Sequence, residues 1–262
     1  MVISSDNEDE ENFKKGYYEQ VDNGALFALK RERIHENLAQ SDVPYDNALL
    51  FLKSVSDFDY AYQWSWLGVP IIKLPEDIVV IQEFFYFYKP DAIIEIGIAR
   101  GGGLKLYYSL QKLLSRDINV LGIDLKIFEH TIDALREEIA AGLRIVEADS
   151  ISDLAIKAIT EFISDKKRIL MILDGDHSHR QVLSELKIYG NLLPVGSYIL
   201  VADTITEDLN LADKPRPWGK GNNPKTALKE FLSQDGSWIR DSVWGRRATI
   251  SESRDGWIVK MK

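Results

Sequence analysis

Two aspartates near the middle of the chain have the type and spacing of a metal-binding pair. Asp174 follows the apolar run 169–173, and Asp203 follows the apolar run 198–202. If these runs are neighbouring parallel strands, both carboxylates lie at the same edge of the sheet, where a hard divalent ion such as Mg²⁺ would offset their repulsion. The alternative is that each acid only caps the element that follows it.

A histidine lies close to the first of these acids. His177 follows Asp174 by three residues, so a metal ligand and a general base can share one site. A histidine near its unperturbed pKa of about 6.5 can take the proton of a hydroxyl group whose acidity a metal has raised. We predict that His177 is this base, with His179 as its rival.

A second set of residues has the pattern of a nucleoside site. Gly97 and Gly101 follow the apolar run 92–96 with the spacing Gly-x-x-x-Gly, which allows a tight turn but differs from the Gly-x-Gly-x-x-Gly of dinucleotide sites. Glu95 can accept hydrogen bonds from a ligand ammonium group, whereas it would repel a pyrophosphate. These residues therefore favour a ligand with an ammonium group over one with a pyrophosphate.

Polar residues also end the next two apolar runs. Asp124 is placed to hold both ribose hydroxyls of an adenosine, as an acid at this position does in nicotinamide-dependent enzymes. Asp149 and Ser150 follow the third run, where either one could instead cap the next helix. Three polar strand ends in order, on successive strands, are unlikely to arise by chance.

Five short apolar runs must position these side chains. They alternate with helical stretches, which predicts a doubly wound, Rossmann-like α/β fold with a mostly parallel sheet. Ligands bind beyond the carboxyl ends of such strands. The expected strands are 92–96, 120–124, 143–148, 169–174 and 197–203, and the expected helices are 76–88, 102–115, 128–141, 151–164 and 180–193.

The C-terminal part departs from this alternation. Residues 204–223 contain two prolines and two glycines near their end and are interpreted as a candidate lid loop, followed by a helix over 224–233. The segments 241–251 and 257–261 flank a turn and are expected to form an antiparallel hairpin that completes a seven-stranded sheet.

The N-terminal part is expected to be an extension of the main domain. Residues 1–12 read as a disordered acidic tail. Residues 13–75 form a helical and aromatic extension, with a helix over about 23–40 and a turn at 42–45. The main domain then spans residues 76–262.

Composition excludes several classes of protein. The 262 residues include 32 Lys and Arg against 41 Asp and Glu, so no general attraction to nucleic acid or to an anionic membrane is expected. The absence of cysteine excludes disulfides, thiolate metal sites and cysteine nucleophiles. No apolar run approaches the ~20 residues of a membrane span, and the acidic N-terminus is unlike a signal peptide. We therefore expect a cytoplasmic protein.

Together the motifs resemble the cephalosporin-hydroxylase-like and rhamnosyl O-methyltransferase family of class I S-adenosylmethionine-dependent methyltransferases. The resemblance extends from about residue 60 to the C-terminus. It rests on Tyr62-Gln-Trp64 with Gly68, Lys73 and Pro75, on Glu95-Ile-Gly97, Gly122-Ile-Asp124, Asp149-Ser-Ile-Ser-Asp153 and Leu173-Asp-Gly-Asp-His-Ser178, and on Asn223-Pro-Lys-Thr-Ala-Leu-Lys-Glu-Phe-Leu232.

The resemblance implies a methyl donor and the residues that hold it. S-adenosylmethionine is expected over Gly97 and Gly101, with Glu95 toward its methionine end and Asp124 on its ribose. Asp149 and Ser150 are then expected near the adenine ring.

The resemblance also implies a metal-binding acid at Asp174 and a catalytic histidine at His177. The family tends to have a Glu-Asp pair on the fifth strand, whereas this chain has Ala202-Asp203. That difference removes one metal ligand, so Thr204 is expected as a weak third ligand unless water replaces it.

The implied reaction is methyl transfer to a hydroxyl group of a sugar, a glycoside or a hydroxylated natural product. The acceptor pocket, or alternatively a packing or subunit interface, is expected to include Tyr62, Trp64, Trp66, Lys214 and Trp218. Two other functions stay open: an NAD-dependent oxidoreductase on the same fold, and a non-catalytic nucleoside-binding or assembly protein. We also expect a homo-oligomer.

Overall fold

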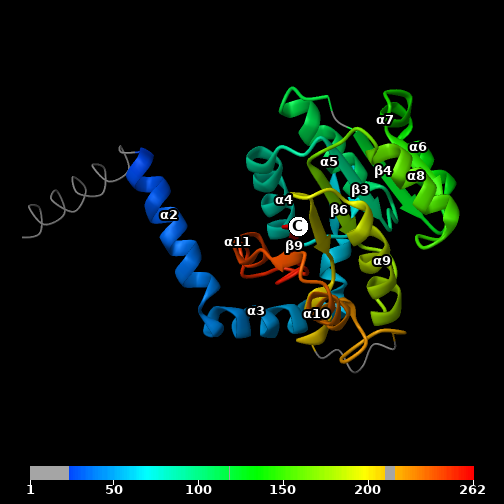
Figure 1. Ribbon diagram of the computed structural model, residues 1–262. Helices are drawn as coiled ribbons and strands as arrows, with labels where there is room; N and C mark the ends of the chain where they lie inside the picture. Colours follow the sequence, from blue (N-terminus) through cyan, green and yellow to red (C-terminus); the bar gives the residue numbers. More distant parts are fainter. Residues whose placement is uncertain (1–23, 118, 210–215) are drawn as a thin grey trace, which may run out of the picture. The chain divides into compact units, whose positions relative to one another are not determined.

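The computed structural model describes residues 24–117, 119–209 and 216–262 (Figure 1). The predicted acidic tail, residues 1–12, lies outside the described residues. The chain divides after Pro44 into two compact units. In the first unit, α2 (Gly24–Ala39) is a helix of 16 residues, as the sequence predicts.

The second unit is built on a sheet that has seven strands within the described residues, in the order β5-β4-β3-β6-β7-β9-β8. Strands β3 to β7 pair in parallel, and β9 runs antiparallel between β7 and β8. This confirms the predicted Rossmann-like sheet with an antiparallel C-terminal edge. The strands are β3 (Ala92–Ile96), β4 (Asn119–Asp124), β5 (Arg144–Glu147), β6 (Ile169–Leu173), β7 (Tyr198–Val201), β8 (Trp238–Arg240) and β9 (Trp257–Lys260).

Helices cover both faces of the sheet, so its central strands β3 and β6 are buried along their whole length. Helices α8, α9 and α10 pack on one face, and α4 and α5 pack on the other with the α6 and α7 region (Figure 1). The helices are α4 (Pro75–Tyr88), α5 (Gly102–Leu113), α6 (Glu129–Ala134), α7 (Arg136–Ala140), α8 (Asp153–Ile163), α9 (His179–Leu192) and α10 (Pro224–Gln234). Because apolar side chains meet from both sides, the strands can be continuously hydrophobic.

Polar side chains fix where the helices begin. Ser152 caps α8, and Ser178 caps α9 by accepting from the backbone N–H of Gln181 over 3.4 Å. Asn223 and Thr226 form a capping box at the start of α10. These caps set the loops at the carboxyl ends of the strands.

Two predicted elements are wrong. The predicted turn at 42–45 is the beginning of helix α3 (Asp42–Val55), because proline in the first turn of a helix loses no hydrogen bond. The predicted strand 241–251 begins as a short helix, α11 (Ser242–Gly245), which Asp241 caps by accepting from two backbone N–H groups. The partner of β9 is instead the preceding segment, β8.

Short elements border the carboxyl edge of the sheet. On one side are the helical turns η1 (Ser56–Phe58) and η2 (Tyr60–Tyr62) and the antiparallel pair β1 (Trp64–Trp66) and β2 (Val69–Ile71). On another, η3 (Thr204–Glu207) follows β7. Among the described residues, no helix has the length and apolar character needed to cross a membrane.

Candidate active site

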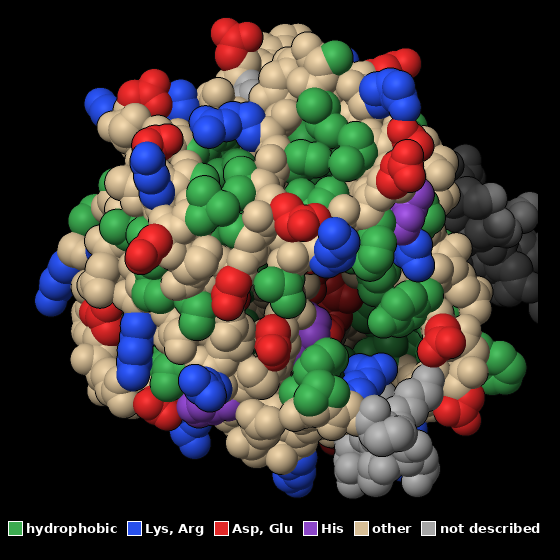
Figure 2. Space-filling view, turned by 90° about the vertical axis from the view of Figure 1, so that its right-hand side faces the viewer, with side chains coloured by type: hydrophobic (Ala, Val, Ile, Leu, Met, Phe, Trp, Pro, Cys, Tyr) green, Lys and Arg blue, Asp and Glu red, His purple; other side chains and the backbone are tan. Residues whose placement is uncertain are grey.

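A cavity of about 880 Å³ lies at the carboxyl edge of the parallel strands. This is where the fold class places its ligands. A hollow with acidic and histidine side chains on its walls is visible in the surface of the molecule (Figure 2). Of the residues predicted from the sequence, the cavity is lined by Tyr62, Glu95, Gly97, Asp124, Asp149, Ser150, Asp174, His177, Asp203 and Trp218.

The turn between β3 and α5 forms the floor of the cavity. Gly97 has a φ of 88°, and a Cβ at this position would lie 2.2 Å from the carbonyl oxygen of Asp174. Only glycine therefore lets the turn pack against the end of β6. Gly101 also has positive φ but does not line the cavity, because it faces Leu135 and Thr131.

Asp124 holds this turn in place. Its Oδ2 accepts hydrogen bonds from the backbone N–H groups of Ile98 (2.9 Å) and Ala99 (3.1 Å), and its Oδ1 accepts from that of Lys126 (3.1 Å). The carboxylate also lines the cavity. Asp124 therefore shapes the turn in addition to any contact it makes with a ligand.

The residues after β5 differ in exposure. Asp149 is exposed and accepts from the backbone N–H of Ile151 over 3.1 Å. Ser150 is buried and is hydrogen-bonded to Glu185 and Gln181. Neither caps α8, since that role falls to Ser152.

Glu95 is a buried acid on β3 with an exposed fraction of 2%. Its Oε1 accepts from the hydroxyl of Tyr107 over 2.8 Å, and its Oε2 has no hydrogen-bond partner among the described residues. Burial raises the pKa of Glu95 to about 7, and the nearby ammonium of Lys73 opposes that rise. The free oxygen of a buried carboxyl group can accept from a cationic ligand.

A buried lysine neutralises the first acid of the predicted metal pair. Lys73 Nζ donates to Asp174 Oδ2 over 2.7 Å and lies 3.7 Å from Glu252 Oε1. Burial alone would lower the pKa of Lys73, but Asp174 and the other neighbouring acids hold it well above its ordinary value. Burial raises the pKa of Glu252 well above its usual range.

The second acid of the pair lies beside the predicted base. Asp203 has a φ of 54°, a conformation that is uncommon outside glycine and is often associated with functional sites. Its Oδ2 lies 3.4 Å from Nε2 of His177, whose ring packs edge-on against Trp218 at a centroid distance of 5.0 Å.

The oxygen atoms of Asp174 and Asp203 suit a hard cation and line one cavity. Within the described ranges, however, no three His, Asp or Glu side chains gather closely enough to hold one ion. Thr204, the predicted third ligand, is fully buried, and its hydroxyl donates to the carbonyl of Arg254 over 2.7 Å, so it does not face the cavity. A cation at this edge would therefore have two carboxylates and water as its ligands, and Lys73 forms an ion pair with one of these carboxylates, Asp174.

His179 lies apart from these groups. Its Nδ1 is 2.8 Å from the hydroxyl of Thr226 and its Nε2 is 3.0 Å from Oε2 of Glu230, so both ring nitrogens bind α10. It does not line the cavity, whereas His177 does.

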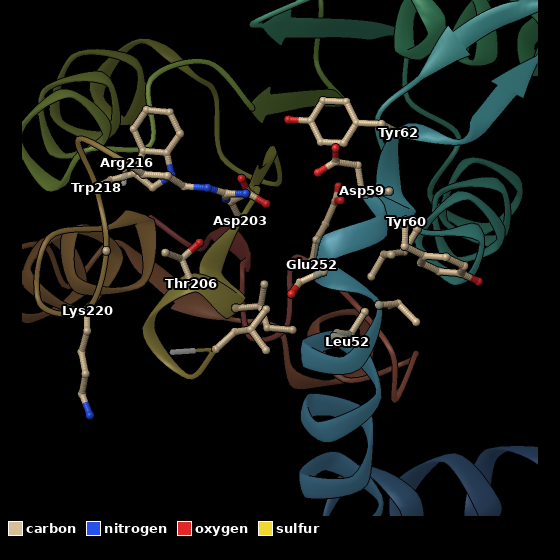
Figure 3. Close-up of a pocket in the computed structure, with 17 residues that line it drawn as sticks. Leu52, Asp59, Tyr60, Tyr62, Asp203, Thr206, Arg216, Trp218, Lys220 and Glu252 are labelled. Atoms are coloured by element: carbon tan, nitrogen blue, oxygen red, sulfur yellow. The ribbon is translucent and has the colours of Figure 1, made fainter. Parts of the chain in front are cut away.

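A second cavity of about 370 Å³ adjoins the first and shares Asp203, Glu252 and Trp218 with it. Tyr62 and Trp218 lie on opposite sides of the opening, with Asp203 and Glu252 between them (Figure 3). Its inner wall is apolar and consists of Leu52, Val55, Leu74, Ile205 and Leu209.

The predicted aromatic residues divide between this cavity and the core. Tyr62 and Trp218 line it, whereas Trp64 and Trp66 pack against the hydrophobic core and Trp66 donates to the hydroxyl of Ser109 over 2.7 Å. For Trp64 and Trp66 the structure therefore agrees with the packing alternative, and for Tyr62 and Trp218 with the pocket. Lys214 lies outside the described residues.

Sequence reasoning assigned no role to several side chains of the larger cavity. Lys73 and Glu252 come from segments far apart in sequence, so no local motif joins them. Gln181 and Glu185 lie one turn apart on α9, and Glu185 falls among the buried positions of that helix. The sequence carries one signal that could have identified Glu185, which is an acid at a helix position where the periodic pattern expects an apolar residue.

The strand order and the ligand cavity beyond the strand ends define a Rossmann-like α/β protein with a nucleoside-binding edge. Residues 58–261 of the sequence match the sequence profile of the rhamnosyl O-methyltransferase/CmcI family. The chain belongs to this family, which confirms the resemblance seen in the sequence motifs.

The chain is also similar in sequence to named proteins and similar in fold to solved structures. The rhamnosyl O-methyltransferase of Mycobacterium leprae is 24% identical over 198 residues, which cover 75% of this chain and 82% of that protein. The rhamnosyl O-methyltransferase of Mycobacterium bovis is 26% identical over 168 residues, which cover 64% of this chain and 65% of that protein. An apo structure of CmcI has a TM-score of 0.56 at 17% identity, covering 77% of each chain, and a CmcI structure with Mg and S-adenosylmethionine has a TM-score of 0.52 at 17% identity, covering 77% and 78%.

Proposed function

We propose that this chain is an S-adenosylmethionine-dependent O-methyltransferase, assisted by a divalent cation, that methylates a hydroxyl group of a sugar, glycoside or hydroxylated natural product. The observation that carries the proposal is the connection of two cavities at Asp203, which lies beside His177. One cavity has the nucleoside-type strand ends, and the other has an apolar wall with aromatic side chains at its opening. Family membership supports the same reaction.

The methyl donor fits the larger cavity. Gly97 lets the turn that forms the floor pack against the end of β6, and Glu95 offers an unpartnered carboxyl oxygen to the donor's ammonium group. Asp124 lies toward the ribose, and Asp149 with Ser150 lies at the adenine end. When bound, the sulfonium supplies an activated methyl group, so the protein mainly has to orient the acceptor and remove one proton.

His177 is the proposed general base. Because Nε2 faces Asp203, a proton on Nε2 leaves Nδ1 free to accept the proton of the acceptor hydroxyl. Asp203 then stabilises the imidazolium, and the edge of Trp218 holds the ring in position. His179 is unsuited to this role because both of its nitrogens bind α10.

Asp174 and Asp203 are the proposed metal ligands, and Thr204 is left out because it is buried elsewhere. A divalent cation would raise the acidity of the acceptor hydroxyl. Lys73 keeps Asp174 neutralised and in place in the described structure.

The smaller cavity is the proposed acceptor site. Its volume of about 370 Å³ lies at the lower end of small-molecule sites, which favours one or two rings over a longer oligosaccharide. The aromatic rings of Tyr62 and Trp218 can contact the apolar face of a sugar ring.

Calorimetric titration with S-adenosylhomocysteine and with NAD tests the proposal. We expect saturable binding of S-adenosylhomocysteine and none of NAD at the same concentrations, because Glu95 would repel a pyrophosphate beside the turn. Preference for NAD would favour the oxidoreductase. A cytoplasmic location, homo-oligomeric assembly and the absence of nucleic-acid and membrane partners stay predictions from the sequence.

A further inference from the structure

One wall of the larger cavity carries three hydrogen-bonded side chains. Ser150 Oγ donates to Glu185 Oε1 over 2.5 Å and accepts from Gln181 Nε2 over 2.9 Å. All three residues line the cavity. Ser150 and Glu185 have exposed fractions of 9% and 1%, so both are buried in the cavity wall, and Gln181 is half-buried.

The direction of these hydrogen bonds is determined by Glu185. An ionised carboxylate can only accept, so the hydroxyl proton of Ser150 must point toward it. The hydroxyl oxygen of Ser150 can then only accept from Gln181, which turns the NH₂ group of that amide toward Ser150. The carbonyl oxygen Oε1 of Gln181 is left on the opposite side of the amide, as a fixed acceptor.

A fixed acceptor distinguishes two closely related bases. Adenine carries an amino group at position 6, which donates, whereas hypoxanthine carries a carbonyl there, which accepts. A glutamine that could reverse its amide would serve both bases equally. A glutamine whose amide is fixed accepts from adenine and repels hypoxanthine.

We infer that Gln181 recognises the 6-amino group of the donor's adenine ring and that Glu185, acting through Ser150, is the positioning residue that fixes the Gln181 amide. The inference rests on the proposed function, because it takes S-adenosylmethionine as the ligand. Glu185 stays buried beneath Ser150, and its Oε2 has no partner among the described residues.

The test compares two nucleosides that differ only at position 6. S-adenosylhomocysteine and S-inosylhomocysteine are titrated calorimetrically into the wild type, Glu185→Gln and Ser150→Ala. The titrations are run at pH 8, above the value of about 7 to which burial raises the pKa of Glu185. Glu161→Gln on α8, at an exposed acid, is the matched control.

We expect the wild type and the control to bind S-adenosylhomocysteine at least about tenfold more tightly than S-inosylhomocysteine. The reason is that S-inosylhomocysteine leaves the carbonyl oxygen of Gln181 facing the carbonyl group of hypoxanthine. In Glu185→Gln the amide can donate or accept, and in Ser150→Ala the link is absent, so the ratio of the two affinities should fall below about three in each. If Glu185→Gln fails to fold, Ser150→Ala decides the question.

Other outcomes would overturn the inference. A wild-type ratio near one, or a ratio that persists in both variants, means that Gln181 is not fixed in this way. If Glu185 had only a structural role, Glu185→Gln would weaken the binding of both nucleosides equally and leave the ratio of their affinities unchanged. Absence of any S-adenosylhomocysteine binding by the wild type would instead reject the proposed function itself.

Discussion

The buried carboxyl group of Glu95 makes donor binding depend on pH. Burial raises its pKa to about 7, but only the ionised form attracts the ammonium group of the ligand. Affinity is therefore lost as the pH falls through 7. Glu95 is about one-tenth ionised at pH 6 and about nine-tenths at pH 8, so the affinity for S-adenosylhomocysteine should rise about tenfold across this range, or about 1.4 kcal/mol.

Calorimetry at pH 6, 7 and 8 measures this dependence. Titrations at pH 6 in two buffers with different ionisation heats should show the release of nearly one proton on binding. Glu95→Gln should bind more weakly at pH 8 and lose the extra dependence on pH, while the titration of the ligand's own amino group affects both proteins equally. A wild-type affinity that stays flat, or the same slope in Glu95→Gln, would refute the role of this carboxyl group.

The same group affects the stability of the ligand-free protein. Its folded pKa of about 7 lies above the ordinary value of 4.5, so its contribution to stability is fully present below pH 4.5 and is lost as the pH rises through 7. This rise in the pKa of Glu95 corresponds to about 3 kcal/mol of unfolding free energy, lost between pH 4.5 and pH 8. In urea unfolding, Glu95→Gln should gain about this free energy relative to the wild type between pH 4.5 and pH 8.

Three further predictions follow from the site. Asp124→Asn should weaken binding of S-adenosylhomocysteine about 10- to 100-fold by calorimetry, since a charged acceptor that also holds the turn is lost; unchanged affinity would make Asp124 purely structural. His177→Ala should lower the single-turnover methyl-transfer rate about 10²- to 10⁴-fold, and His179→Ala much less, with the reverse order counting against His177 as base. Exhaustive EDTA treatment should abolish turnover and spare donor binding, and full activity after chelation would show that Asp174 and Asp203 hold no required metal.

The strands and their polar ends could be predicted because both depend on local sequence. The buried parallel strands are continuous apolar runs, and the fold class places their carboxyl ends at one edge. Asp124 and Asp174 therefore fall at the cavity as expected. The contact between Lys73 and Asp174 spans 101 positions in sequence, and no periodicity reports such a pairing.

The errors also have physical causes. Thr204 follows Asp203, but the left-handed conformation of Asp203 turns the chain and buries the threonine hydroxyl on Arg254. The aromatic residues between 58 and 66 look alike in sequence, yet Trp66 packs in the core while Tyr62 is 60% exposed at the cavity. Composition gives the residue types, and only the tertiary packing decides which side each faces.

The central claim is methyl transfer to oxygen, and product analysis tests it most directly. The purified protein is incubated with S-adenosylmethionine carrying an isotopically labelled methyl group, Mg²⁺ and a panel of rhamnosides and other glycosides, and the products are analysed by mass spectrometry and NMR. We predict at least one acceptor that gains a single labelled methyl group on a hydroxyl oxygen, with one S-adenosylhomocysteine formed per product. Saturable donor binding with no label transferred to any hydroxylated acceptor, or label transferred only to nitrogen or carbon, would contradict the account.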